Sequence, residues 1–290
     1  MSTERRISEH VTILAGDRGG AYPAGNPLRV VGGGTTVLLD SAVDVDLAGV
    51  DLVLLSHYHE DHVAGVGPYG VLAAIHEFDA PAVRSWPEFG RYMQLPPGEW
   101  EQSLRRDFSW GEIDDVVTFG DETEFDVGGG VKVHTIPLPG HTGGHCGFFV
   151  EPDGVLYLAD VDLSSFGPMY ADLESELADV RATLETCRGF DAAVYAGFHH
   201  KGPYTDRDEY LAALDVHASA VDAREARLRE LLAAGPLTVE GAVGRGVVYR
   251  LGGRRPWFAD GVESTMCGLH LEELVERGVV VAESGWYELV

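Results

Sequence analysis

The chain has 290 residues, 45% of them apolar, which is enough for one large α/β core and a small second unit. Its formal net charge is −26, so we expect it to repel nucleic acid and anionic membrane surfaces at low salt. The sequence contains no run of about 18 apolar residues, so no membrane span is expected.

The first half of the chain is predicted to be rich in strands. Strands are expected at residues 11–14, 28–31, 35–40 and 52–55, with a glycine turn at 32–34. A short helix should follow at 62–70, then strands at 71–75 and 82–83, and a helix near 99–108. Further along, alternation and Gly/Asp turns predict an antiparallel-looking series of strands at 116–119, 124–127, 131–136, 146–150 and 155–159.

The second half is predicted to be mainly helical. Residues 173–187 have helical periodicity, and a short strand is expected at 192–196. The composition changes after Tyr204, where a long helix is expected at 206–234, followed by a helix at 269–277 and strands at 279–282 and 286–290. A helix before a β-ribbon is typical of a winged helix, so the sequence predicts two units, 1–204 and 205–290.

Composition also predicts where the protein works. Acidic residues are abundant and the only lysines are Lys132 and Lys201, which indicates a halophilic protein whose self-repulsion is screened by salt. The three cysteines lie far apart and are odd in number, so no disulfide framework is expected. The first ten residues lack the apolar stretch of a secretory signal. We therefore expect a reducing, cytoplasmic environment.

The most informative segment is residues 55–62, which read Leu-Ser-His-Tyr-His-Glu-Asp-His. His57, His59, Asp61 and His62 directly follow the apolar strand expected at 52–55. His57 and His59 are two residues apart, so on extended backbone they project to the same side. Imidazole and carboxylate groups in this pattern indicate a site for Zn²⁺, Fe²⁺ or Mn²⁺.

Three more segments place similar side chains after predicted strands. His141 follows the strand at 131–136, Asp160 ends the strand at 155–159, and His199 and His200 follow the strand at 192–196. Four strands therefore present metal-type ligands from their carboxyl ends, which predicts that the ligands converge on one pocket.

With these motifs in this order, the chain resembles the metallo-β-lactamase superfamily over residues 10–204. The resemblance implies an α/β fold, a four-layer αβ/βα sandwich with two metal ions at one edge, followed here by the small winged-helix-like extension. It implies that one ion is held by His57, His59 and His141, that the other is held by Asp61, His62 and a late histidine, and that Asp160 bridges them. For the late ligand, the distance from the strand favours His199. The preferred assignment is His200, because the residues after it resemble the His-x-x-Pro of the family.

Further residues are candidates for supporting roles. The segment 38–42 resembles the Asp-x-Gly of the family, so Asp40 is either the acceptor that orients a ligand imidazole or part of an ordinary turn. His145 is expected to be structural or to support the ligands. Lys201 is expected to attract an anionic group of the substrate, unless it is simply a surface lysine.

The expected reaction is hydrolysis of a small molecule. Two divalent ions, zinc before iron or manganese, would supply a bridging hydroxide that attacks an ester, thioester or lactone carbonyl, and Asp61 would help to move the proton. One alternative is a mononuclear iron enzyme of the persulfide dioxygenase type. Another is a metal-dependent ribonuclease or phosphodiesterase, although nucleic acid is the less favoured partner. This alternative is supported by a local basic stretch, which consists of Arg245, Arg250, Arg254 and Arg255. The extension is expected to cover the active site or to form a homodimer.

Overall fold

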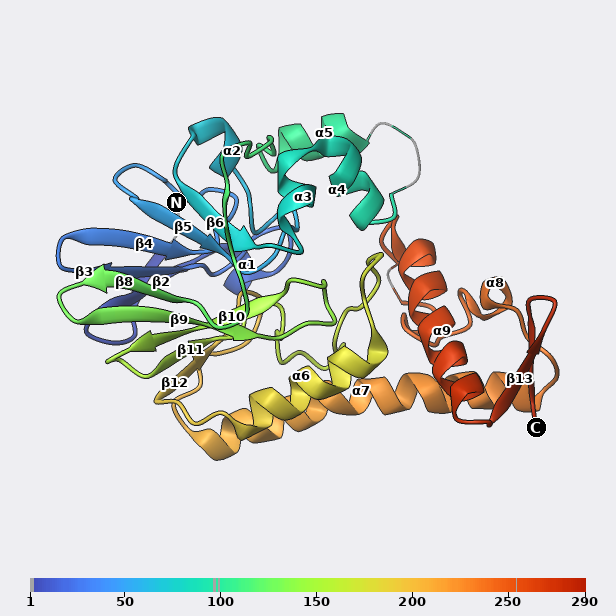
Figure 1. The fold of residues 1–290 in the computed structure, drawn as a ribbon. Coiled ribbons are helices and arrows are strands. Elements are labelled where there is room, and N and C mark those ends of the chain that lie inside the picture. The colour runs from blue at the N-terminus through green and yellow to red at the C-terminus, as the bar shows by residue number, and fades with distance from the viewer. Residues whose placement is uncertain (1–2, 96–97, 99, 254) are drawn as a thin grey trace.

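Two β-sheets packed face to face form the centre of the molecule (Figure 1). The computed structural model describes residues 3–95, 98, 100–253 and 255–290. The first sheet is antiparallel from β1 to β4 and parallel from β4 to β7. In spatial order, its strands are β1 (Thr3–Arg6), β2 (Val11–Ala15), β3 (Leu28–Gly32), β4 (Thr35–Leu39), β5 (Leu52–Leu55), β6 (Ala73–His76) and β7 (Val117–Phe119).

The second sheet is antiparallel except at one edge, where β11 and β12 are parallel. Its strands in spatial order are β12 (Val194–Ala196), β11 (Val155–Tyr157), β10 (Cys146–Glu151), β9 (Val131–Pro137) and β8 (Glu124–Gly128). Each sheet therefore contains a parallel portion, and the loops that leave these strands carry most of the candidate ligands.

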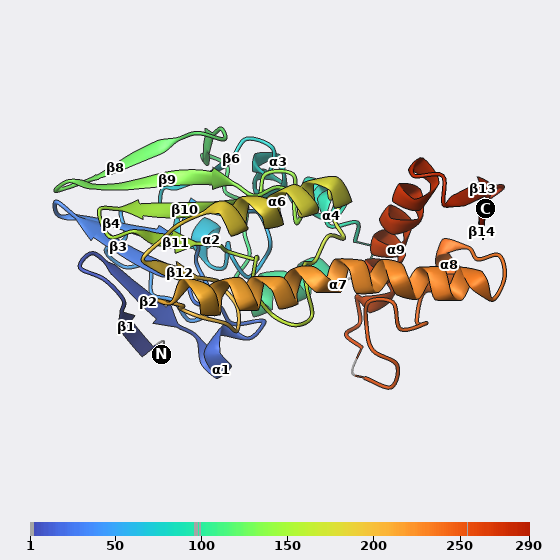
Figure 2. The same cartoon turned by 90° about the horizontal axis from the view of Figure 1, so that it is seen from below.

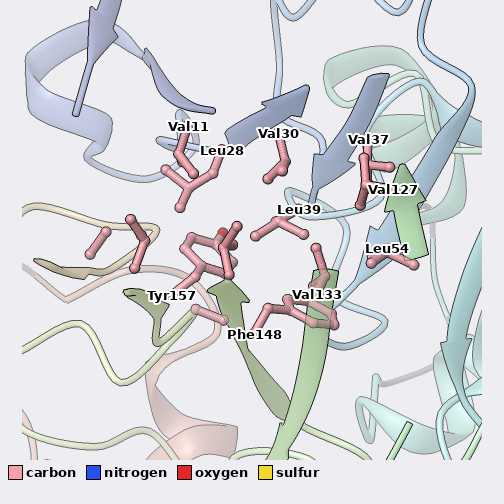
Figure 3. Close-up of a cluster of buried hydrophobic side chains, with 14 of the residues drawn as sticks. Val11, Leu28, Val30, Val37, Leu39, Leu54, Val127, Val133, Phe148 and Tyr157 are labelled. Carbon is pink, nitrogen blue, oxygen red and sulfur yellow. The ribbon is translucent and has the colours of Figure 1, made fainter. Parts of the chain in front are cut away.

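The main core lies between the two sheets (Figure 3). In β9, Val133 is fully buried and faces this core, whereas its neighbours Lys132 and His134 are partly exposed. This alternation is expected of a strand with only one buried face. In β5, by contrast, Leu54 packs in this core and Leu55 packs against the helices on the other side. Because both faces of this strand are buried, its residues form a continuous apolar run in the sequence.

Helices cover the outer face of each sheet, which confirms the predicted four-layer architecture. The first sheet is covered by α2 (Val66–Tyr69), α3 (Ala80–Arg84), α4 (Trp86–Tyr92) and α5 (Trp100–Asp107). The second sheet is covered by α6 (Leu177–Gly189) and by the amino-terminal part of α7 (Arg207–Ala233). One further short helix, α1 (Asp17–Gly20), belongs to the loop between β2 and β3.

The carboxyl-terminal residues form a smaller unit at the far end of α7 (Figure 2). It contains α8 (Val239–Ala242), α9 (Ala259–Glu276) and a hairpin of β13 (Val280–Glu283) and β14 (Trp286–Leu289). An apolar cluster that includes Leu228 of α7 and Leu271 of α9 holds this unit together. The cluster behind the second sheet, however, combines Leu156 of β11 with Val221 of α7 and Met266 of α9, so an apolar core spans both predicted units.

Some predicted elements differ from the structure. Residues 82–83 were expected as a strand but lie in α3, where Pro81 occupies the start of the helix, a position that suits its fixed backbone. The strand at 116–119 was expected in the antiparallel series, yet β7 pairs in parallel with β6 in the first sheet. The helix at 269–277 begins earlier, at Ala259. The winged-helix comparison is not confirmed, and Arg254 of the basic stretch lies outside the described residues.

None of the helices in the described ranges has the length and apolar character needed to cross a bilayer.

Candidate metal centre

Four strands end at the same edge of the sandwich, and the loops that follow them meet there. The loop after β5 carries His57, His59, Asp61 and His62, and the loops after β9, β11 and β12 carry His141, Asp160 and His199. Strands that run in the same direction have their carboxyl ends at one edge of a sheet, and β9, β11 and β12 run in the same direction, which is why ligands far apart in the sequence converge. The structure thus brings together residues from His57 to His199, which are some 140 positions apart in the chain. This convergence is what the sequence predicts.

The first group consists of three imidazoles and one carboxylate. Nε2 of His141 lies 3.2 Å from Nε2 of His57 and 3.1 Å from Nδ1 of His59. Oδ2 of Asp160 lies 3.3 Å from the same His141 nitrogen. Because zinc–nitrogen bonds are about 2.0 Å long, a tetrahedral site has ligand–ligand edges of about 3.3 Å. The first group therefore has the spacing of a four-coordinate metal site.

The second group is formed by Asp61, His62 and His199. Nε2 of His199 lies 3.1 Å from Oδ2 of Asp61. Nε2 of His62 lies 2.9 Å from Oδ1 of Asp160. Since the other oxygen of Asp160 faces the first group, this carboxylate lies between the two groups and can serve both.

Close approach does not satisfy all ligand atoms of this centre, because the contact of His62 with Asp160 at 2.9 Å and that of His199 with Asp61 at 3.1 Å are ion-pair distances without hydrogen-bond geometry. Oδ2 of Asp61, Nε2 of His62 and Oδ1 of Asp160 are buried and have no hydrogen-bond partner among the described residues. A buried polar atom without a partner costs about 1–3 kcal/mol, more when it is charged. Coordination of cations would satisfy all three atoms at once, so the residues present fit a pair of metal ions.

The histidine ligands are also oriented as metal ligands require. A ligating imidazole usually donates its other N–H to an oxygen, which fixes the ring and leaves the free nitrogen facing the metal. His62 donates from Nδ1 to Asp40 at 2.9 Å, and His199 donates from Nδ1 to the Gly20 carbonyl at 2.8 Å. Nδ1 of His141 donates to the Met169 carbonyl at 2.9 Å. Each of these three rings therefore presents Nε2 to the centre.

Asp40 is held in place by a small buried network. Its carboxylate accepts hydrogen bonds from the backbone N–H and the hydroxyl of Ser56, at 2.7 and 2.8 Å, and from the hydroxyl of Tyr157 at 2.8 Å. Its backbone is left-handed, with φ of 60°. The predicted role of Asp40 as the acceptor for a ligand imidazole agrees with its contact to His62.

Asp172 is a site residue that the sequence reasoning missed. Its Oδ2 accepts from Nε2 of His59 at 2.7 Å and from the hydroxyl of Tyr58 at 2.5 Å. Burial alone would lower the pKa of His59, but the charge of Asp172 and its hydrogen bond outweigh burial and raise the pKa to about 9. Asp172 therefore holds the proton on Nε2 and leaves Nδ1 facing the first group. No motif marks Asp172, because it lies in an irregular loop with other acidic residues.

Burial keeps two further imidazoles neutral. The pKa of His57 is held well below its usual range by burial and then by the neighbouring histidines. The pKa of His145 is lowered to about 3, again by burial first. His145 donates to the Leu138 carbonyl at 2.8 Å and accepts from the backbone N–H of Asp160 at 3.2 Å. It therefore supports the segment that carries Asp160 and is not in either ligand group.

The structure corrects the preferred choice of the late ligand. His199 joins Asp61 and His62, whereas His200 is exposed and belongs to neither group. Phe198 turns into the core and packs on His62, which places the next side chain, His199, in the centre. The backbone at His200 is left-handed, with φ of 49°, and directs the chain away. The side chain of Lys201 is exposed beside these residues.

Comparisons with known proteins agree with this architecture. The family model described as "Metallo-beta-lactamase superfamily" matches residues 25–200. Among solved structures, a metallo-beta-lactamase family protein from Thermus thermophilus is 22% identical with a TM-score of 0.69, covering 92% of this chain and 94% of that chain. A beta-lactamase domain protein from Burkholderia ambifaria is 16% identical with a TM-score of 0.70, covering 99% and 93%. The sequence matches none of the curated proteins with which it was compared.

A third similar structure is that of a di-zinc enzyme. It is a class B3 di-zinc metallo-beta-lactamase from an Alaskan soil metagenome, 14% identical with a TM-score of 0.53, covering 74% of this chain and 90% of that chain. At such identities the likeness to these structures shows the fold.

Proposed function

The chain belongs to the metallo-beta-lactamase superfamily, and from this premise we propose that it is a dinuclear metal-dependent hydrolase of esters, thioesters or lactones. The observation that carries the proposal is the carboxylate of Asp160, with one oxygen beside each ligand group. A centre that shares one carboxylate is suited to two ions a few Å apart, as in other two-metal hydrolases.

The residues of this chain would hold the ions and handle charge and protons. His57, His59 and His141 would hold one ion, and Asp61, His62 and His199 the other. Two ions held there would lower the pKa of bound water enough to give hydroxide near neutral pH and would polarise a carbonyl oxygen. Asp61 would also help to move a proton to the leaving group, because its carboxylate lies inside the centre, 3.1 Å from Nε2 of His199. Asp40 and Asp172 keep two imidazoles aligned while the charge changes.

Charge at the rim favours neutral or cationic substrates. The loops around the centre, at residues 16–27, 56–65, 158–176 and 197–201, contain many acidic residues, and their basic residues are Arg18 and Lys201. This rim carries more negative charge than two divalent cations would neutralise, so it repels polyanions such as RNA. We therefore favour a carboxylic ester, thioester or lactone over a phosphodiester. Lys201 remains a proposed contact for a single anionic group.

Metal content is the decisive first measurement. We propose that protein purified in high salt without chelators contains about two transition-metal ions per chain, zinc before iron or manganese. One iron per chain together with oxygen consumption on a persulfide would instead support the dioxygenase alternative. Activity only on a phosphodiester would support the nuclease alternative.

A matched pair of variants tests the role of Asp160. Asp160→Asn should lose at least one of the two ions and most of the activity on a panel of esters, thioesters and lactones. Asp191→Asn is the control, because Asp191 is exposed between α6 and β12 and belongs to neither ligand group. Equal metal content in wild type and Asp160→Asn would refute a bridging role.

A further inference from the structure

One face of α7 contacts the loop between Asp160 and α6 through three side chains at helical spacing. His217 donates from Nδ1 to the Ser164 carbonyl at 3.0 Å. Ala220 lies under Gly167, where a Cβ on that glycine would come within 2.2 Å of the alanine Cβ. Arg224 completes the row. Residues at i, i+3 and i+7 lie on one side of a helix, so this face of α7 follows the backbone of the loop.

Arg224 is the strongest of these contacts. Its guanidinium donates to the carbonyl oxygens of Phe166 and Pro168, at 2.7 and 2.6 Å, and to the hydroxyl of Tyr170 at 3.1 Å. It also lies over the rings of Phe166 and Tyr170, at 5.2 and 5.3 Å from their centroids. The side chain is 3% exposed, and among the described residues it forms no ion pair with a carboxylate. A buried arginine is stable only when its donors are satisfied, and here the loop backbone satisfies them.

The same short stretch of loop orients two metal ligands. The carbonyl of Met169 accepts from His141, and it lies between the Pro168 carbonyl and the Tyr170 side chain that Arg224 holds. Three residues farther along, Asp172 accepts from His59. The loop is therefore fixed on one side by α7 and on the other side fixes His59 and His141.

α9 adds a second attachment to the same stretch. Nε2 of His270 lies 2.9 Å from the hydroxyl of Tyr170. Both residues are fully buried. The extension thus contacts the loop from two helices, whereas the ligands that the loop orients belong to the first group only.

We propose that Arg224 is a positioning residue for the metal centre, through which the carboxyl-terminal extension sets the metal affinity of the group His57, His59 and His141. Removal of Arg224 frees the loop, and His59 and His141 lose their fixed orientation. The group Asp61, His62 and His199 is oriented by Asp40 and Gly20, which Arg224 does not contact. The loss of affinity is therefore selective. Loss of an outer partner of a metal ligand typically costs 10–100-fold in affinity. The inference rests on the proposed dinuclear centre.

The test is a titration of metal-free protein with Co²⁺, followed by its visible absorption and by competition with a chelator. Wild type should bind two ions. Arg224→Met should bind one ion 10–100-fold more weakly and the other with nearly unchanged affinity. Arg224→Lys should recover part of this loss, since an ammonium group cannot reproduce the fork of donors. Arg229→Met is the matched control, because Arg229 is half-exposed on the same helix and, within the part of the chain that the structure describes, pairs only with Glu225.

A second variant tests the same packing of α7 against the loop without removing a buried charge. Gly167→Ala pushes the loop away from Ala220 and should selectively weaken the binding of the same ion. This variant decides the question if Arg224→Met does not fold. Two affinities within about twofold of wild type in a folded Arg224→Met or Gly167→Ala variant would overturn the inference. Failure of the wild type itself to bind two ions would refute the proposed function instead.

Discussion

Lowering the pH should decrease the free energy of unfolding, because His270 is buried as a neutral imidazole. The pKa of His270 gives the size of this decrease. His270 is fully buried against Tyr170. Burial, followed by the positive charges of Arg224 and Arg181, lowers its pKa to about 4, although Glu225 and Asp222 oppose this. In the unfolded chain the pKa returns to about 6.5. Between these values the unfolded state binds a proton that the folded state does not, so stability falls as the pH falls from about 6.5 to about 4.

The difference between the two pKa values corresponds to about 3 kcal/mol once the pH is below 4, and to about 2 kcal/mol at pH 5. We expect His270→Gln to lose about 2 kcal/mol less unfolding free energy than wild type between pH 7 and pH 5. The assay is urea unfolding followed by tryptophan fluorescence, at constant KCl and with a chelator present so that metal binding does not contribute. His200→Gln, which changes an exposed histidine, is the control. If wild type and His270→Gln lose stability in parallel, the buried neutral imidazole is not the cause.

Four further outcomes are expected. His199→Ala should lose one metal ion per chain by elemental analysis, whereas His200→Ala should keep both; the reverse result would restore the choice made from sequence. Asp172→Ala should weaken binding of one ion by 10–100-fold, because His59 loses its acceptor; unchanged chelator competition would argue against this. Leu54→Ala should cost about 2–5 kcal/mol of unfolding free energy, since the side chain is fully buried between the sheets, and a cost below 1 kcal/mol would contradict the packing. Thermal unfolding should shift to higher temperature as KCl is raised, and no shift would count against a halophilic protein.

The ligand set was predictable because its signals are local. His57 and His59 follow an apolar strand, and that context alone places them at the edge of a sheet. Asp160 is marked in the same way by the strand before it. His199 and His200 could not be separated, since the choice depends on one left-handed residue after a buried phenylalanine. Adjacent histidines carry no signal for that turn.

Other features depend on contacts between distant segments. Asp172 contacts His59 from an irregular loop that itself contacts α7 and α9, so nothing near Asp172 in the sequence indicates its role. The strand β7 has the alternation of an antiparallel neighbour of β8, yet it pairs with β6. An alternating pattern predicts which face of a strand is buried. It does not predict the sheet to which the strand belongs, because a strand of either stacked sheet buries one face in the same core. Residues 82–83 are too short an apolar run to distinguish a strand from a helix.

The long helix α7 limits how the carboxyl-terminal extension can be exchanged during evolution. Its 27 residues span about 40 Å, and both ends pack, one behind the second sheet and the other in the terminal unit. A lineage that exchanged this tail for an unrelated one would lose the support of residues 164–170 in the same event. Recombination at the apparent boundary near residue 204 would therefore be expected to disturb the metal centre on the other side of the junction, so we expect the tail and the centre to be inherited together.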